Sequence, residues 1–205
     1  MEPVTRLNPF QKDLDVLDVL PPLPPTLEIL DCGNNYLTSL PLLPSTLKVI
    51  YSHNNKLTSL PPLPLVLVIY CNSNKLTSLP PLPPILEILI CNDNKLVSLP
   101  PLPPILETLD CSSNRLVSLP SLPSTLKELY CYDNNLTSLP LLPPGLKILN
   151  CSHNNLPDWY YNSNIEEVRI RQIQEKVFAA QKKIACRIIR QAWIKHIYFN
   201  AQVGK

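Results

Sequence analysis

Hydrophobic and polar residues recur along this chain with a period of about 20 residues, and this repeat dominates the prediction of its fold. One copy reads LEILICNDNKLVSLPPLPPI from Leu86, with apolar residues, an asparagine and paired prolines at fixed places. The other copies begin at Leu27, Leu47 (a copy that is one residue shorter), Val66, Leu106, Leu126 and Leu146, the last leaving the pattern at Pro157. Self-similarity at this period is typical of solenoids, in which stacked repeats share one continuous core.

Each repeat joins a short alternating segment to a proline-rich half. In the first copy, Leu30 and Cys32 fall on one side of an extended chain, while Ile29 and Asp31 fall on the other. This period of two predicts a strand, and the stacked copies predict an in-register parallel sheet. The half that reads LTSLPPLP is incompatible with a helix, because proline lacks an N–H donor and fixes φ. We therefore expect a β-rich solenoid with the parallel sheet on its concave face and extended, polyproline-II-like segments on its convex face.

An asparagine follows every predicted strand. Its side-chain amide can bond backbone groups of its own turn and of the adjacent turn, where the chain bends away from the sheet. The sequence thus predicts a column formed by Asn35, Asn55, Asn74, Asn94, Asn114, Asn134 and Asn154.

The two ends of the chain depart from the repeat. Residues 1–26 predict an N-terminal cap with a half-repeat that begins near Asp13, residues 27–161 seven repeats, and residues 162–205 a tail. In the tail, Ser163 and Glu166 fit the N-cap and third helical position of a capping box, which predicts a helix from 164 to about 198. Its apolar residues follow spacings of three and four and form one face: Ile170, Ile173, Val177, Ala180, Ile184 and Ile188. Basic residues cluster on a different face: Arg169, Lys176, Lys183, Arg187 and Arg190.

Charge separates the repeats from the tail. Residues 1–161 hold 9 Lys and Arg against 13 Asp and Glu, a net charge of −4, while residues 162–205 hold 9 against 3, a net charge of +6. Net acidic repeats argue against nucleic acid as a partner. No apolar run approaches the ~20 residues of a transmembrane helix, and the first residues do not read as a signal peptide. The chain has seven cysteines, an odd number. Together with the expected absence of a signal peptide, this number predicts an intracellular, reducing location such as the cytoplasm.

The frame L-x-x-L-x-C-x-x-N-x-L-x-x-L-P-x-L-P resembles the leucine-rich repeat family, in its 20-residue bacterial-effector class of the IpaH and YopM type. The resemblance runs from Leu17 to Trp159, and the chain departs from the class pattern by placing cysteine where the family mostly has an aliphatic residue. It implies an effector-like protein of a bacterium or virus that acts inside a host cell. In that class a ubiquitin-ligase domain with a catalytic cysteine often follows the repeats, but it is far larger than the segment that remains after Tyr161.

The sequence predicts no enzyme, cofactor or metal site. The repeated Cys32, Cys71, Cys91, Cys111, Cys131 and Cys151 are interpreted as buried thiols, because parallel in-register side chains do not converge as a disulfide requires. His53 and His153 lie five rungs apart, ~24 Å, and cannot share a metal. Cys186 lies in a basic helix without a positioned His or Asp, so a regulatory subunit or an enzyme with this nucleophile is the weakest alternative.

The outward face of the sheet is the first candidate binding surface. Its side chains are not needed to fill the core, and apolar and aromatic residues gather there in the second to fourth repeats, extended by two later tyrosines. Such patches mark interaction sites, although Val, Ile and Tyr also suit any strand. The predicted partner-binding residues are Val49, Tyr51, Val68, Tyr70, Ile88, Ile90, Tyr130 and Tyr132. Lys56, Lys75, Lys95 and Arg115 form a basic column beside the asparagines, interpreted as a solvated rim or a contact for an acidic partner.

The tail is the second candidate. The segment from Ile184 to Phe199 resembles a degenerate IQ motif, in which Arg190 and Ile194 replace the expected Gln and Arg. A basic amphipathic helix can bind calmodulin, an anionic membrane surface or another helix, or it can cap the last repeat. The predicted tail-binding residues are Arg187, Arg190, Trp193 and Lys195. The leading hypothesis is a non-enzymatic module that binds a partner protein on the concave face, and an adaptor that acts through the tail is the alternative.

Overall fold

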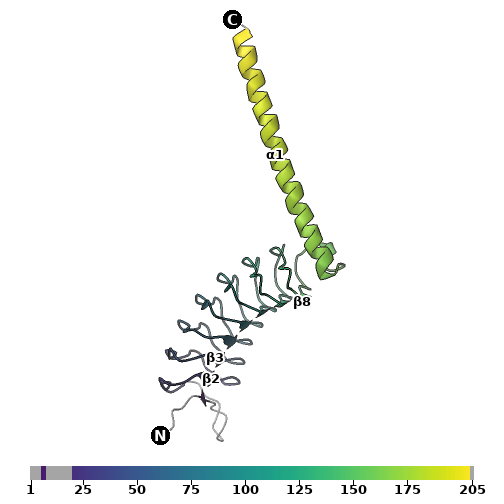
Figure 1. Cartoon of the computed structure of the whole chain (residues 1–205). Coiled ribbons are helices and arrows are strands. Elements are labelled where there is room, and N and C mark those ends of the chain that lie inside the picture. The colour runs from purple at the N-terminus through teal and green to yellow at the C-terminus, as the bar shows by residue number, and fades with distance from the viewer. Residues whose placement is uncertain (1–5, 8–19, 204–205) are drawn as a thin grey trace. The chain divides into compact units, whose positions relative to one another are not determined.

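The structure is a computed structural model that describes residues 6–7 and 20–203, with side chains described from 20 to 187 and at 190 and 191. The chain divides into two compact units, Met1–Ile165 and Glu166–Lys205. The first unit contains the repeats, stacked one on the next, and the second is helical (Figure 1). Among the described residues, no helix is both long enough and apolar enough to span a membrane.

Eight parallel strands form one sheet in the order β1 to β8. Every strand pairs with the same positions of the next repeat, so that Ile29 lies opposite Val49, Val49 opposite Val68, and Val68 opposite Ile88. This register confirms the predicted in-register parallel sheet. The strands are β1 (Arg6–Leu7), β2 (Ile29–Asp31), β3 (Val49–Tyr51), β4 (Val68–Tyr70), β5 (Ile88–Ile90), β6 (Thr108–Asp110), β7 (Glu128–Tyr130) and β8 (Ile148–Asn150).

Alternation along each strand separates the core from the outward face, as predicted. From β2 to β7 the central residue is buried and its two neighbours are half-buried. The buried column consists of Leu30, Ile50, Ile69, Leu89, Leu109 and Leu129, each at most 1% exposed. Because all six are large aliphatic residues in adjacent rungs, they form a continuous hydrophobic core along the stack.

The proline-rich halves run opposite the sheet without helix or strand, in agreement with the prediction. Their leucines close the core from that side: in the repeat from Leu47, Leu57 and Leu60 are buried and Leu63 is half-buried. Figure 1 shows the strands on the inner side of the curved stack of turns. The outward face of β2–β8 is called the concave face below.

The asparagine column forms the predicted ladder between turns. The Nδ2 group of Asn94 donates to the carbonyls of Cys91 and Asn92 in its own turn, at 3.2 Å each, and to Cys71 of the preceding turn at 3.0 Å. Its Oδ1 accepts from the backbone N–H of Leu76 at 2.9 Å. The same pattern recurs at Asn55, Asn74, Asn114, Asn134 and Asn154.

Replacement of Asn94 by alanine is expected to lower the free energy of unfolding by about 1–3 kcal/mol, because it strands shielded backbone groups on both turns. Asn92 provides the matched control. It precedes the turn on the concave face, and its replacement by alanine should change stability by no more than about 0.5 kcal/mol. Urea titrations of the two variants measure the difference, and equal losses would contradict the assigned role of the ladder.

The residue before each ladder asparagine has a left-handed backbone. These residues have φ between 49° and 54° and include no glycine: Asn34, Asn54, Ser73, Asp93, Ser113, Asp133 and His153. Asn, Asp and His tolerate this region better than most residues, whereas Ser does so at greater cost. The conformation aims the backbone N–H at the next repeat, as in the 2.9 Å bond from Asn34 to the His53 carbonyl. It therefore continues the hydrogen bonding between turns beyond the strands.

The six repeated cysteines are free and buried, as predicted. Burial raises the pKa of the Cys71 thiol to about 12. Burial, together with the nearby Asp31 carboxylate, raises the pKa of Cys32 to about 12. The pKa values of the other four are also raised, with burial as the main cause. These thiols are therefore protonated at neutral pH and act as small apolar residues of the core. Ser52 replaces cysteine in the one shortened repeat and is equally buried.

Thiol labelling of the native chain should modify Cys186 first and the six repeat cysteines slowly, because Cys186 is exposed and the others are buried and protonated. The raised pKa values also predict a pH dependence. Unfolded thiols ionise near their ordinary value of about 8.5, whereas Cys32 and Cys71 in the folded chain remain protonated to about 12. Stability should thus be undiminished below pH ~8 and fall as the pH rises through this window. Rapid native labelling of several repeat cysteines would contradict the buried assignment.

The last repeat ends in an aromatic turn that the repeat pattern does not contain. A short 3-10 helix, η2 (Asp158–Tyr160), follows Pro157, and the rings of Trp159 and Tyr160 stack at 3.9 Å. The hydroxyl of Tyr161 accepts from the Leu156 N–H at 3.3 Å and donates to the Asn154 carbonyl at 2.9 Å. In each earlier repeat, from Leu37 to Leu136, the N–H of the equivalent leucine donates to the Oδ1 of the next ladder asparagine. Tyr161 therefore provides the acceptor that an eighth asparagine would have supplied.

The helix α1 (Ile165–Val203) forms the second unit. It starts one residue later and ends about five residues later than the sequence predicted. The residue before its first turn is Asn164, so the predicted N-cap, Ser163, lies one residue too early.

The N-terminal segment differs from the irregular cap that was expected. Arg6 and Leu7 form β1, which pairs in parallel with Ile29 and Leu30 of β2 and adds a strand to the sheet. Leu20, from the predicted half-repeat, is buried. The predicted start of that half-repeat near Asp13 lies outside the described residues.

Candidate interaction surface

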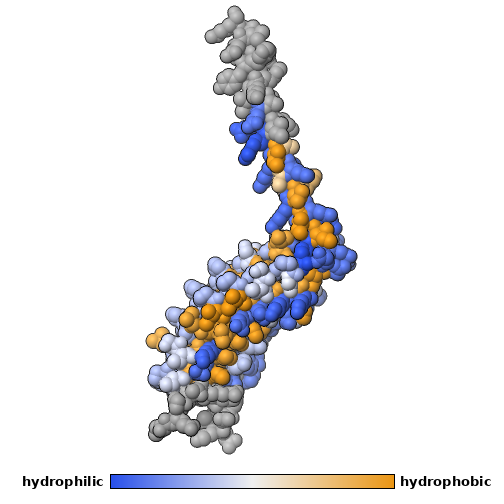
Figure 2. Space-filling view, viewed as in Figure 1, coloured by the Kyte–Doolittle hydropathy of each residue, from blue (hydrophilic) through white to orange (hydrophobic). Residues whose placement is uncertain are grey.

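Six of the eight predicted partner-binding residues lie together on three adjacent strands. Val49, Val68 and Ile88 form one row across β3, β4 and β5, and Tyr51, Tyr70 and Ile90 form a second row beside it. We call these six residues the apolar patch. All six are half-buried and belong to the concave face. Figure 2 shows apolar residues gathered along the stack of repeats with hydrophilic residues beside them.

The two tyrosines of the patch contact each other. The ring centroids of Tyr51 and Tyr70 are 5.2 Å apart, and the ring planes are tilted by 36°. This geometry lies in the favourable range for aromatic pairs, and it limits the freedom of both side chains. The two rings therefore lose less conformational entropy when a partner binds.

Tyr130 and Tyr132 do not extend the patch without a break, contrary to the prediction. Strand β6 lies between β5 and β7 and places Thr108 and Asp110 in the two rows. The Tyr130 hydroxyl contacts the Glu128 carboxylate at 3.5 Å. Partial burial, followed by the negative charge of Glu128, raises the pKa of Tyr130. The later tyrosines thus belong to a more polar area, which the patch borders but does not include.

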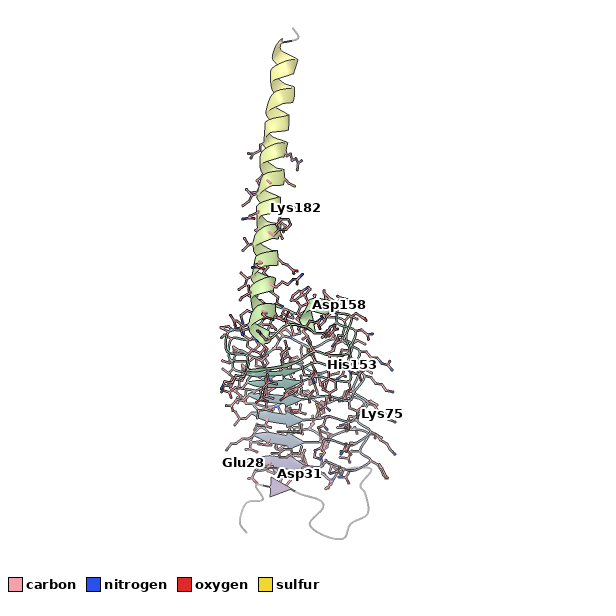
Figure 3. All side chains as sticks on the ribbon, turned by 90° about the vertical axis from the view of Figure 1, so that its right-hand side faces the viewer. Glu28, Asp31, Lys75, His153, Asp158 and Lys182 are labelled. Atoms are coloured by element: carbon pink, nitrogen blue, oxygen red, sulfur yellow. The ribbon has the colours of Figure 1, made fainter. Side chains whose placement is uncertain are left out.

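Charged residues border the patch on both sides. Before the strands, an ion pair joins Lys48 to Glu28 at 2.9 Å, and a second pair, Lys127 to Glu107 at 2.7 Å, lies further along the sheet, before β6 and β7. Beyond the strands, the column of Lys56, Lys75, Lys95 and Arg115 is exposed. Figure 3 shows Glu28 and Lys75 on opposite sides of the stacked strands, with Asp31 between them. The concave face is thus apolar at its centre and charged at its edges, which is the usual composition of a protein interface.

Two contributors to this surface escaped the sequence analysis. Leu67 is half-buried next to Val68, in the column where the neighbouring repeats place Lys48 and Glu87. A comparison of repeats at that one column would have identified it. Tyr36 lies at the head of the basic column, and the Lys56 Nζ sits 4.2 Å from the centre of its ring. That cation–π contact orders the first residues of the rim.

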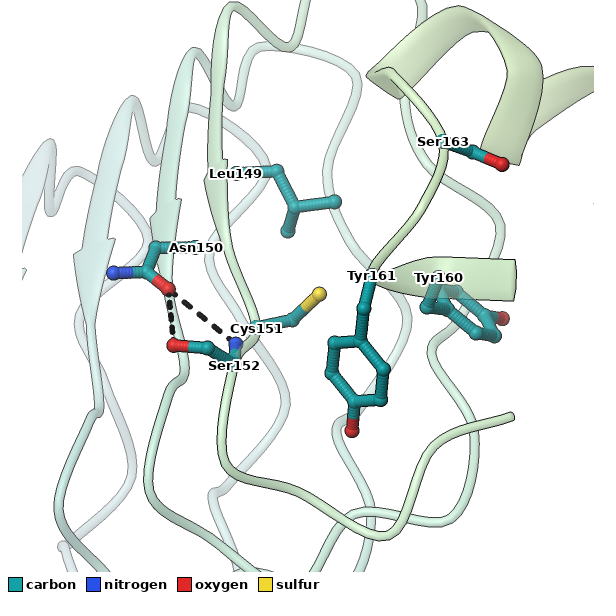
Figure 4. A pocket seen from close by; sticks show the side chains of 7 residues that line it. All are labelled: Leu149, Asn150, Cys151, Ser152, Tyr160, Tyr161 and Ser163. Atoms are coloured by element: carbon teal, nitrogen blue, oxygen red, sulfur yellow. Dashed lines mark hydrogen bonds between the residues drawn. The ribbon is translucent and has the colours of Figure 1, made fainter. Parts of the chain in front are cut away.

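A hollow of about 260 Å³ lies at the C-terminal end of the repeats (Figure 4). Leu149, Cys151, Tyr160 and Tyr161 line it, together with Asn150, Ser152 and Ser163. Asn150 Oδ1 accepts from the N–H and hydroxyl of Ser152, at 3.3 and 2.8 Å. The Asn150 Oδ1 and the Ser152 hydroxyl are thus bonded to each other, and the lining holds no charged side chain, so we assign no ligand to the hollow.

The predicted tail-binding residues all lie on α1. Arg187 and Arg190 are exposed, while the side chains of Trp193 and Lys195 lie outside the described part of the helix. Cys186 is exposed as well. Binding through the tail stays a prediction. Within the described residues, no group of three His, Cys, Asp or Glu side chains comes together as a metal site requires.

Solved structures similar to this chain include bacterial leucine-rich repeat proteins, among them effectors. YopM from Yersinia enterocolitica superposes with a TM-score of 0.64 and 37% identity over 69% of this chain and 36% of its own. YopM from Yersinia pestis gives 0.63 and 39% over 69% of this chain and 39% of its own. The leucine-rich repeat domain of a Shigella effector gives 0.66 and 32% over 77% of this chain and 73% of its own.

The extent of these matches differs between the relatives. The chain spans little more than a third of the Yersinia proteins but about three quarters of the Shigella domain. Comparison with protein-family models and with curated proteins found no match. The repeat frame and the parallel sheet agree with these three solved structures, which are 32% to 39% identical to the chain. The chain belongs to the leucine-rich repeat family, in the class of the bacterial effector proteins.

Proposed function

We propose that this protein is a non-enzymatic interaction module that binds a partner protein on its concave face. The observation that carries the proposal is the apolar patch, six apolar and aromatic side chains in register on β3, β4 and β5 that the core does not use. The core is already filled by the central residue of each strand and by the leucines of the proline-rich halves. The requirements of folding therefore leave the outward residues open to selection for binding.

The patch has the dimensions and composition of an interface centre. Three rungs at ~4.8 Å and two rows of side chains form a surface that one element of a partner can cover. Tyrosines at the centre of such surfaces contribute much of the binding free energy, and a charged rim contributes mainly to specificity and to association rate. The paired Lys48 and Glu28 and the basic column at Lys75 provide that rim.

The relatives support an effector-like role inside a host cell. The Yersinia pestis and Shigella proteins are described as effectors. Six free, buried cysteines are in keeping with a reducing compartment, in which thiols are not oxidised to disulfides. We extend the effector role to this chain as part of the proposal.

The test is capture of partners from a host-cell lysate by the immobilised full chain. The parent should retain a partner that a Tyr51→Ala, Tyr70→Ala variant does not retain, since the two contacting rings are the aromatic members of the patch. A variant with Arg187 and Arg190 both replaced by glutamine serves as the control for binding through the tail. Loss of the partner from the control variant, with retention by the tyrosine variant, would place binding on α1 and contradict the proposal.

A further inference from the structure

Apolar side chains along the first half of α1 are exposed to solvent. Ile170, Ile173, Val177 and Ile184 are 47%, 48%, 49% and 60% exposed. Helices in proteins derive most of their stability from packing of an apolar face against another element. The helix α1 has 39 residues, so its exposed apolar residues indicate that a partner covers them.

The spacing of these residues identifies the kind of partner. Ile170, Val177 and Ile184 recur every seven residues, and Ile173 and Ala180 follow the first two at intervals of three. These are the a and d positions of two heptads, the pattern of a coiled-coil seam, and the exposed Phe178 lies outside it. A narrow a/d seam fits the matching seam of a second helix, with knobs packed into holes.

The residue types within the seam fit a parallel coiled coil. All three a residues, Ile170, Val177 and Ile184, are β-branched, and the d positions hold Ile173 and Ala180. The seam covers 14 helical steps, or ~21 Å, and Arg187 occupies the next d position and ends it. The predicted contact is therefore short and its affinity concentration-dependent.

Polar residues beside the seam select the parallel orientation. Lys176 and Lys183 flank it at the g positions, and Gln174 and Gln181 flank it at the e positions. In a parallel pair, g of one helix meets e of the other, so that Lys176 faces Gln181 without charge repulsion. In an antiparallel pair, g meets g, and lysine faces lysine at a cost in stability. The flanking residues thus permit self-association in one orientation and oppose it in the other.

We propose that α1 pairs with α1 of a second copy of this chain as a parallel two-stranded coiled coil over residues 170–184. This inference rests on α1 alone and goes beyond binding on the concave face. Pairing would link two concave faces in one particle, and a partner that presents two copies of its binding element would be held more tightly through the higher effective concentration.

Sedimentation velocity of the full chain, over a range of concentrations, tests the proposal. We expect a concentration-dependent species with twice the 23.1 kDa mass of one chain. Val177→Lys should weaken its association about tenfold or more, because position 177 lies in the seam. Phe178→Lys is the matched control. Phe178 is larger and more exposed, at 67%, but it lies outside the seam, and its replacement should weaken association less than about threefold.

Equal effects of the two substitutions would show general hydrophobic adhesion and overturn the proposal. A parent chain that stays monomeric at every concentration would overturn it as well.

Cross-linking tests the orientation of the two helices. In a Cys186→Ser background, Ile184→Cys should form a disulfide between copies under mild oxidation, because residues at the same a position face each other only in a parallel pair. Ala185→Cys, one residue outside the seam, should not. Equal cross-linking of both variants, or of neither, would contradict the parallel pair.

Discussion

Truncation of Ile69 to alanine is expected to lower the free energy of unfolding by about 2–5 kcal/mol. Ile69 is fully buried at the centre of β4, between Ile50 of β3 and Leu89 of β5. Removal of its outer carbons leaves a cavity between rungs whose spacing is fixed by the backbone ladder, so the neighbours cannot close it. The cost should therefore fall in the upper part of the range for aliphatic truncations.

The matched control is the same substitution at Ile88, one strand away on the concave face. Ile88 is half-buried and its side chain points away from the core, so Ile88→Ala should cost no more than about 1.5 kcal/mol. Urea titrations followed by far-ultraviolet circular dichroism measure both variants. Because each repeat contacts only its neighbours, the loss at Ile69 should also widen the transition by uncoupling the two halves of the stack. Similar losses at the two positions would mean that inward and outward residues have been misassigned.

The core and the ladder could be predicted because each is a periodic consequence of local geometry. The two-residue alternation in Ile29–Asp31 fixes which side chain points inward, and repetition multiplies this signal over seven copies. The asparagine after each strand could be assigned because the bend removes sheet hydrogen bonds that some polar group must replace. The burial of the cysteines could be predicted from the same alternation, since Cys32 lies two residues after the buried Leu30.

Features that occur once could not be predicted in this way. The Tyr161 hydroxyl takes the role of a ladder asparagine only because the chain turns back after Pro157, and the repeat pattern does not predict that turn. The pairing of Arg6 and Leu7 with β2 joins segments that are distant in the sequence and share no repeat frame. The first residue of α1 was placed one residue too early because Ser163 and Asn164 are both favourable N-cap residues and each has a glutamate three residues later.

The candidate site was predicted in part. Rows of outward residues followed from the register, so the six residues of the apolar patch could be grouped from the repeat pattern alone. The break at β6 was overlooked because the later tyrosines were weighed by residue type, while the intervening Thr108 and Asp110 were not. Leu67 was missed because each repeat was considered by itself. Its apolar side chain stands out only when the same position is compared between repeats, where its neighbours are Lys48 and Glu87.

Replacement of both Tyr51 and Tyr70 by alanine is expected to weaken binding of the partner about 30-fold or more. Each ring at the centre of an interface can contribute ~2 kcal/mol or more, and ~2 kcal/mol corresponds to about 30-fold in Kd. The rings contact each other at 5.2 Å, so their contributions are coupled and the double variant need not lose the sum of two single losses. The purified full chain and the captured partner, measured by isothermal titration calorimetry, provide the affinity.

This experiment needs one control for loss of folding and another for the place of the tyrosine on the surface. The double variant loses an aromatic contact on the outward face and should unfold at a free energy about 1 kcal/mol lower, which leaves it folded. Tyr36→Ala removes a tyrosine that is 51% exposed on the rim, outside the apolar patch, and should change Kd less than about threefold. If the double variant binds as tightly as the parent, the concave-face hypothesis is wrong and the basic tail becomes the leading candidate site. If Tyr36→Ala costs as much as the double variant, the partner contacts the rim and its basic column instead of the apolar patch.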